Sequence, residues 1–136
     1  FEKDYSEKLK KDGINKKKRK DYATAPFRTQ CYDAVALIAL AIEKAGPGFL
    51  KMSSREQGKA IAKNMRSIAN PPGRMIRYNE FPKAFQALKA GKDVNYQGVS
   101  GPITLDKNGD IREAAIVIWH VKDGKTLTVW TVDVKQ

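Results

Sequence analysis

The chain is organised around residues 95–110, whose sequence is NYQGVSGPITLDKNGD. Two glycines and a proline, Gly98, Gly101 and Pro102, fall within five residues of this stretch, and such a run suits neither a helix nor a central strand. A helical repeat of apolar residues precedes the stretch, and a strand-like alternation follows it. We therefore expect these residues to form a joint between two folded bodies.

The composition suits one folded domain with a strong positive charge. The 136 residues are 41% hydrophobic, and 26 basic against 15 acidic side chains give a formal net charge of +11. Such a charge raises nucleic acid or an anionic membrane as a partner. Its densest cluster, Lys16–Lys20, lacks the interleaved aromatic residues of a nucleic-acid interface. We expect a solvated loop there and no nucleic-acid partner, with a basic nucleic-acid-binding module as the remote alternative.

The N-terminal residues have the pattern of a helix that is already under way. Phe1 and Tyr5 are spaced one helical turn apart, and Gly13 is the residue type that most often ends a helix. No capping residue precedes Phe1, which favours a fragment of a longer protein. Residues 14–26 are expected to form an irregular basic connector that closes at Pro26.

Three further helices are predicted before the joint. Residues 27–45 are apolar on nearly all sides, which predicts a helix buried on most of them. Ser53 and Glu56 form a capping-box pattern, so a helix should begin there and end at the Asn-Pro-Pro-Gly break of residues 70–73. Residues 80–90 repeat apolar side chains at helical spacing and predict the third helix.

Beyond the joint the apolar period changes to two. Residues 115–121 and 127–134 alternate on either side of Asp123-Gly124, which predicts a β-hairpin with a tight turn. Both faces of residues 114–118 are apolar, so we expect a strand that is covered on both sides. A two-stranded hairpin is marginal alone, and no other stretch obviously supplies a larger sheet. This missing sheet also favours a fragment.

The reactive side chains are too few for catalysis. One cysteine and one histidine exclude an internal disulfide, a Ser-His-acid triad and a multi-histidine metal site within this chain. We expect Cys31 to be a small buried side chain, His120 to be structural or on the surface, and the protein not to be an enzyme. The Asp106–Asp110 run has its glycine fourth and Val117 at the twelfth position, so it predicts a turn between short strands rather than a calcium loop. No metal or cofactor is implied.

Tyr32 is the best candidate for a binding residue. It lies at the start of the helix predicted over residues 27–45, where a phenol can offer an apolar face and a hydroxyl group to a small ligand beside the helix amides. Packing in the core, with the hydroxyl group bonded locally, is the alternative that the residues leave open.

Several blocks of the sequence, taken in order, closely resemble the C-terminal third of type I periplasmic solute-binding proteins. The blocks are YDAV (32–35), AIEKAG (41–46), IANPPG (68–73), LKAGKDVNYQGVSGP (88–102) and DKNGD (106–110). The likeness is to the branched-chain amino acid and amide receptors of ABC importers. It implies an α/β, bilobal Venus-flytrap fold, in which a ligand binds in the cleft between two lobes and the lobes close on it.

The resemblance also implies a layout for the chain. Residues 1–95 would be the closing helical segment of the first lobe, and residues 111–136 would be the C-terminal β-hairpin of the second lobe. Residues 96–110, called the crossover below, would pass between the lobes, with the two glycines and the proline as its hinge.

The implied partners are a small amino acid or amide ligand and the membrane permease of an ABC transporter. Tyr32 falls on a tyrosine that contacts ligand in some amino-acid-binding members, whereas the main ligand-binding segments of the family lie outside this chain. The location would be periplasmic, or lipid-anchored at the outer face, with the signal segment absent from this chain. A ligand-sensing domain of the same fold in a receptor or regulator is the alternative. An isolated fragment would bury its exposed helix and strand surfaces by forming a dimer or by exchanging elements between copies.

Overall fold

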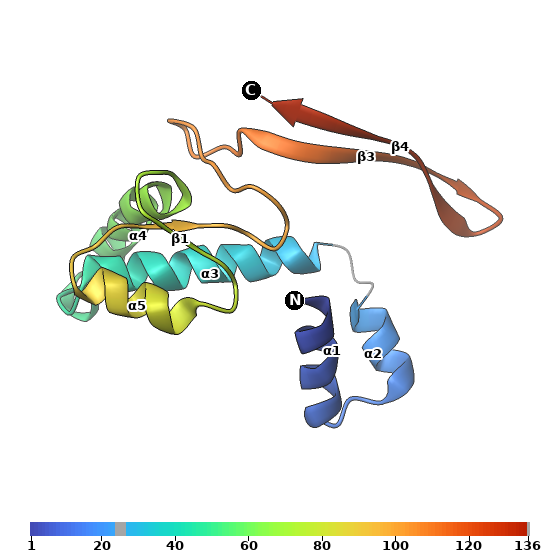
Figure 1. Ribbon diagram of the computed structural model, residues 1–136, viewed down its shortest axis with the longest axis horizontal. Coiled ribbons are helices and arrows are strands. Elements are labelled where there is room, and N and C mark those ends of the chain that lie inside the picture. Colours follow the sequence, from blue (N-terminus) through green and yellow to red (C-terminus); the bar gives the residue numbers. More distant parts are fainter. Residues whose placement is uncertain (24–26, 136) are drawn as a thin grey trace.

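The computed structural model describes residues 1–23 and 27–135 as an α/β chain in three parts (Figure 1). Two short helices form the N-terminal part. A helical body follows, with three helices and a small parallel sheet among the described residues, and an antiparallel hairpin forms the C-terminal part. The hairpin extends away from the helical body, and the crossover joins the two (Figure 1).

The helix predicted near the N-terminus is confirmed as α1 (Glu2–Lys11). Gly13 follows it with a left-handed φ of +74°. Several contacts hold α1 against the helical body, among them an ion pair and a ring contact at the start of α3. The guanidinium group of Arg28 donates hydrogen bonds to both carboxylate oxygens of Glu2, at 2.6 and 2.8 Å, and the rings of Phe1 and Tyr32 meet edge-on with their centroids 4.9 Å apart.

The irregular connector predicted over residues 14–26 is wrong, because α2 (Lys16–Ala23) occupies most of it. The physical reason is local. The side-chain oxygen of Asn15 accepts a hydrogen bond from the Lys18 N–H at 3.0 Å, as a helix-capping residue does, and lysine and arginine are good helix formers. Pro26, the expected end of the connector, lies outside the described residues.

The three helices predicted next are confirmed as α3 (Arg28–Ala45), α4 (Ser54–Ala69) and α5 (Phe81–Lys89). We predicted α3 to be buried on most sides, but only one face is buried, and Val35 and Ile38 are 67% and 40% exposed. Among the described residues α4 and α5 pack along α3, and these two neighbours cover one stripe of an apolar helix rather than its whole surface.

The capping box is confirmed at the start of α4. The Ser53 hydroxyl oxygen accepts from the Glu56 N–H at 3.4 Å, and the Glu56 carboxylate accepts from the Ser53 N–H at 2.8 Å. The helix ends at Ala69, immediately before the predicted break at residues 70–73. A short 3-10 turn, η1 (Phe49–Lys51), lies between α3 and α4.

A two-stranded parallel sheet inside the helical body was not predicted. Its strands are β1 (Arg74–Ile76) and β2 (Val94–Tyr96). Each strand has three residues, too few to show an alternation, and parallel pairing across an intervening helix leaves no local signal. Gly73 precedes β1 because a side chain there would lie 2.7 Å from the backbone of Val94.

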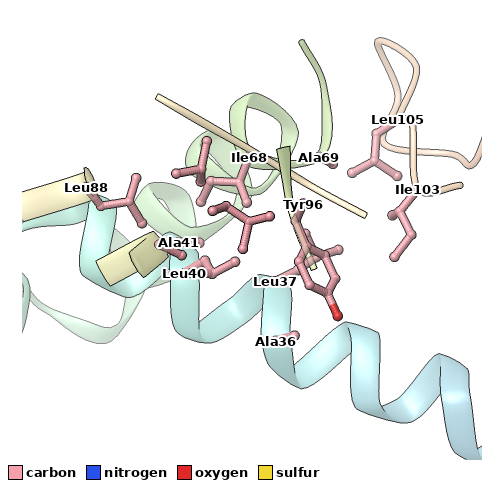
Figure 2. Close-up of a cluster of buried hydrophobic side chains, with 13 residues drawn as sticks. Ala36, Leu37, Leu40, Ala41, Ile68, Ala69, Leu88, Tyr96, Ile103 and Leu105 are labelled. Carbon is pink, nitrogen blue, oxygen red and sulfur yellow. The ribbon is translucent and has the colours of Figure 1, made fainter. Parts of the chain in front are cut away.

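One apolar core holds the helical body together (Figure 2). It draws side chains from all three helices of the body, from both short strands and from the crossover. Its buried residues are Ala36, Leu37, Leu40, Ala41, Ile68, Ala69, Ile76, Ala84, Leu88, Val94, Tyr96, Ile103 and Leu105. Because Ile103 and Leu105 belong to the crossover, that segment packs as part of the body instead of forming a free linker.

The predicted hairpin is confirmed as β3 (Glu113–Lys122) and β4 (Lys125–Lys135), an antiparallel pair. Asp123 and Gly124 join them with positive φ angles of 52° and 69°, as a two-residue type I′ turn requires. The register shifts between Ile118 and Trp119, which marks a β-bulge in the opposite strand.

Both faces of the hairpin are exposed among the described residues. Trp119 and Trp130 lie on opposite faces by the strand register, and they are 57% and 65% exposed. The prediction of a strand covered on both sides is therefore wrong for this chain as it stands. The reason is that β1 and β2 form a separate sheet and do not extend the hairpin.

Candidate functional site

The crossover is bound to the helical body by one buried carboxylate, that of Asp33 in α3, which is 3% exposed. One of its oxygens accepts hydrogen bonds from the Tyr96 hydroxyl at 2.7 Å and from the Val99 N–H at 2.9 Å. The other accepts from Ser100, through the N–H at 2.8 Å and the hydroxyl at 2.6 Å. Hydrogen bonds to an ionised acceptor are stronger than neutral ones, so these contacts, called the Asp33 tie below, fix the start of the crossover.

Tyr96 is the buried member of the Asp33 tie. Its side chain is fully buried, and its ring stacks on Phe81 with the centroids 6.0 Å apart. Burial, and then the hydrogen bond to Asp33, raises the pKa of the Tyr96 hydroxyl far above its usual value. This hydroxyl therefore stays protonated and remains a donor to the carboxylate throughout the physiological range.

The predicted hinge residues fall into two kinds. A side chain at Gly98 would collide with Ile103 and would lie 2.7 Å from a carboxylate oxygen of Asp33, so close packing requires glycine there. Gly101 instead has open space around it and a φ of +129°, where other residues are strained. Gly98 is thus part of a packed anchor, whereas Gly101 and Pro102 lie at the edge of a groove.

A second set of contacts holds the far end of the crossover. The side-chain amide of Asn70 donates to the Leu105 carbonyl at 2.7 Å, and its oxygen accepts from the Leu105 N–H at 2.8 Å. The turn predicted next is confirmed, because the Asp106 carboxylate accepts from the N–H groups of Asn108 and Asp110 at 2.8 and 2.9 Å. Hydrogen bonds from the backbone, that of Asp110 first, lower the pKa of the Asp106 carboxyl group.

A groove of about 380 Å³ lies where the crossover passes between the helical body and the hairpin. The start of α3 forms one wall, the hairpin forms another, and the crossover runs between them. The lining residues are Gln30, Ser100, Gly101, Pro102, Ile111, Glu113, Ala114, Ala115, Asp133 and Val134. Because its walls come from both bodies, any rotation of the hairpin relative to α3 would change the shape of this groove.

Tyr32 lines a different groove from Gly101 and Pro102. Its hydroxyl group donates to the Tyr78 carbonyl at 3.3 Å, and burial, followed by the charge of Asp33, raises the pKa of the phenol. With residues of α3 and α5, the Tyr32 ring lines an open apolar groove of about 280 Å³. Tyr32 is therefore packed locally, and its side chain is separate from the hinge residues.

We did not predict the role of Asp33, although the sequence holds a signal for it. Asp33 lies on the same face of α3 as the buried Ala36, Leu37 and Leu40. An acidic residue in an apolar stripe must be buried with hydrogen-bond donors around it. Its hydrogen-bond donors lie 63 to 67 positions further along the chain, so a local sequence pattern could not predict which residues bind the carboxylate.

The remaining candidates are on the surface. Cys31 is exposed, contrary to our expectation, because it lies on α3 away from the buried stripe. His120 is exposed on β3, one of the two settings predicted for it. The described residues contain no group of three or more side chains that could hold a metal ion. Within the same residues, no helix combines the length and apolar character needed to cross a membrane.

Comparison with known proteins identifies the family. Residues 2–124 match the family described as "Receptor family ligand binding region". The chemotactic signal transduction system substrate-binding protein BasB of Halobacterium salinarum is 29% identical over 80 residues, which are 59% of this chain and 17% of that protein. The chain thus spans less than a fifth of this curated relative. No solved structure matches the chain. Since the family match covers nearly the whole chain, the protein belongs to the receptor family ligand binding region, a type I periplasmic-binding-protein-like family of binding proteins rather than enzymes.

Proposed function

We propose that these residues form the C-terminal part of a bilobal solute-binding protein of an ABC importer. The ligand would be a branched-chain amino acid or a similar small polar molecule, bound between the lobes. The Asp33 tie is the main support for this proposal. Its hydrogen bonds hold the crossover on the helical body, while the hairpin, a separate sheet, extends beyond the crossover. The name of the curated relative, a substrate-binding protein, supports the same role.

In this proposal residues 1–95 belong to the first lobe, residues 96–110 form the crossover, and residues 111–136 belong to the second lobe. The exposed apolar faces of the hairpin support the assignment, because a strand pair with two apolar faces suits the inside of an α/β lobe. The relative is much longer than the matched stretch, which leaves room for the strands and helices that would cover those faces.

Closure of the lobes would turn the hairpin about the crossover. The Asp33 tie holds Ser100 on the first lobe, and Gly101 and Pro102 follow directly. The open space and positive φ of Gly101 support a change of chain direction there. Gly98 would serve as the fixed side of the hinge. The groove that contains Gln30 and Pro102 would then narrow as the lobes approach.

Tyr32 is the proposed ligand contact of this chain. Its hydroxyl group makes a long hydrogen bond of 3.3 Å to the Tyr78 carbonyl, which a better acceptor on a ligand could replace. The apolar side of its ring faces a groove between α3 and α5 that would suit an aliphatic side chain. The permease of an ABC transporter would be the macromolecular partner, and the site of action would be the periplasm or the outer face of the membrane.

A second candidate is a ligand-sensing receptor of the same fold. The observation that favours it is the relative, whose name places it in a chemotactic signal transduction system. The partner would then be a membrane-bound signal transducer instead of a permease. Deleting the gene distinguishes the importer from the sensor. Loss of amino-acid uptake supports the importer, and loss of a tactic response with normal uptake supports the sensor.

Isothermal titration calorimetry of the complete gene product tests the ligand-binding role. The panel is leucine, isoleucine, valine, other amino acids and short aliphatic amides. We expect saturable binding of at least one compound with a dissociation constant in the micromolar range or tighter, and no detectable binding to the 136 residues alone, because they cannot enclose a ligand. Absence of binding by the complete product, or micromolar binding by the 136 residues, contradicts the proposal.

A further inference from the structure

Neither the core nor the proposed ligand site explains the helix α2. Together with α1 it projects from the helical body at the start of α3 (Figure 1). The three lysines in its first turn, Lys16, Lys17 and Lys18, are all exposed. Among the side chains that the structure describes, which leave out those of residues 20, 21 and 23, none forms an ion pair with their ammonium groups, and no acidic residue lies in that turn.

This arrangement is electrostatically unfavourable for the protein alone. The N-terminal end of a helix carries a partial positive charge, which favours acidic side chains and opposes basic ones. α2 places three basic side chains there. Arg19, which follows them, is already engaged, because its guanidinium group donates to the Ile14 carbonyl at 2.6 Å. A negatively charged surface would be attracted both by the N-terminal end of the helix and by the three exposed ammonium groups.

Two exposed aromatic residues follow the lysines in the sequence, Tyr22 near the end of α2 and Phe27 at the start of α3. Tyr22 is 44% exposed and lies four positions after Lys18, so the two side chains share one face of α2. Phe27 is 72% exposed and has a left-handed φ of 59°, a conformation that costs a residue with a large side chain about 1–2 kcal/mol. The Phe27 carbonyl accepts a hydrogen bond from the Cys31 N–H at 2.8 Å at the start of α3, but this backbone contact does not use the ring, so the exposed ring remains accessible to a contact outside the described residues.

We propose that α2 attaches the protein to an anionic phospholipid surface. Its lysines would contact the headgroups, as polybasic segments do at an anionic leaflet, and Tyr22 and Phe27 would lie at the headgroup level, where aromatic side chains are enriched. A lipid surface fits better than nucleic acid, because base recognition needs aromatic residues interleaved with the basic ones, whereas here they flank the run on its C-terminal side. This inference goes beyond ligand binding and does not depend on it.

Co-sedimentation with vesicles tests the attachment. The complete gene product, expressed without lipidation, is mixed with vesicles of phosphatidylcholine that contain 30% phosphatidylglycerol or none. We expect binding only to the anionic vesicles, and loss of binding in 1 M salt, where the screening length falls to about 3 Å. Replacing Lys16, Lys17 and Lys18 by glutamine, which keeps helix propensity, should lower the partition constant roughly a hundredfold, since each lysine near such a surface contributes about fivefold.

The matched control removes the same charge elsewhere. Lys51, Lys59 and Lys63 are exposed on η1 and α4, and replacing them by glutamine should change vesicle binding by less than about twofold if the position of the charge matters. Equal losses in the two triple variants would mean that net charge alone drives binding, and would overturn the proposal. So would binding to a 20-base-pair DNA duplex without binding to the anionic vesicles.

A substitution at Phe27 separates membrane contact from folding. Phe27→Gly removes the aromatic ring and also relieves the left-handed backbone strain, so thermal stability should hold or rise while vesicle affinity falls several-fold. Unchanged vesicle affinity in this variant would contradict the proposed insertion of the ring. Circular dichroism of every variant confirms that the fold is kept.

Discussion

Replacing Asp33 by alanine is expected to lower the free energy of unfolding by about 3 kcal/mol. The substitution removes the acceptor for Tyr96, Val99 and Ser100 at once. The Tyr96 hydroxyl accounts for the largest share of this loss of stability. It is fully buried, and a buried donor without a partner costs about 1–3 kcal/mol. Val99 is half-buried and Ser100 is exposed, so water can replace part of the hydrogen bonding that their N–H groups lose.

Urea denaturation followed by circular dichroism measures the effect, with Asp93→Ala as the matched control. Asp93 also forms a short contact, 2.6 Å to Lys44, but its side chain is 56% exposed, and such surface pairs contribute about 0–1 kcal/mol. Hydrogen exchange adds a local measurement, because the amides of Val99 and Ser100 should lose protection only in the Asp33 variant. If the free energies of unfolding of the two alanine variants differ by less than about 0.5 kcal/mol, the Asp33 tie does not hold the crossover.

Three further outcomes are expected. Gly98→Ala should destabilise the protein, because the added side chain would collide with Ile103. Gly58→Ala should stabilise it by about 0.5–1 kcal/mol, because Gly58 lies in an exposed part of α4 with open space around it. Shifts of the melting temperature in the same direction for both variants would contradict this difference in packing. Ser53→Ala should cost about 1 kcal/mol at neutral pH. Hydrogen bonds from Ser53, its side chain first, lower the pKa of Glu56 in the folded state, so the cap is complete above the ordinary glutamate pKa and weakens as pH falls through the lowered value. The gap between wild type and Ser53→Ala should therefore narrow in acid, and a constant gap would argue against the reciprocal cap. The 136 residues alone should dimerise through the exposed faces of the hairpin, and a monomer at high concentration by light scattering would refute this.

The elements with local signals could be predicted from the sequence. The Ser53 and Glu56 pair marks the start of α4 by residue type and spacing alone. Asp123-Gly124 marks the hairpin turn, because a type I′ turn needs positive φ angles at both positions. These features depend on interactions within a few residues, which a pattern can show.

The features that were missed depend on distant partners or on the environment. The two short parallel strands pair residue 74 with residue 94, and the Asp33 tie joins positions more than 60 residues apart. The residue type of Cys31 predicts burial, yet the helix turns this side chain away from the buried stripe. The charge run at residues 16–20 predicts a solvated loop, but α2 forms there because solvated lysines still favour a helix.

In the proposed closure, the crossover joins a fixed helical body to a hairpin that moves when ligand binds. Spin labels on α4 and on the hairpin test it, at Lys63→Cys and Lys122→Cys in a Cys31→Ser background, because all three positions are exposed. The distance between the labels is measured by pulsed electron paramagnetic resonance in the complete gene product, with and without the amino acid that binds best in calorimetry. We expect the distance distribution to shift when that ligand is added. A distribution that stays the same at saturating ligand would contradict it.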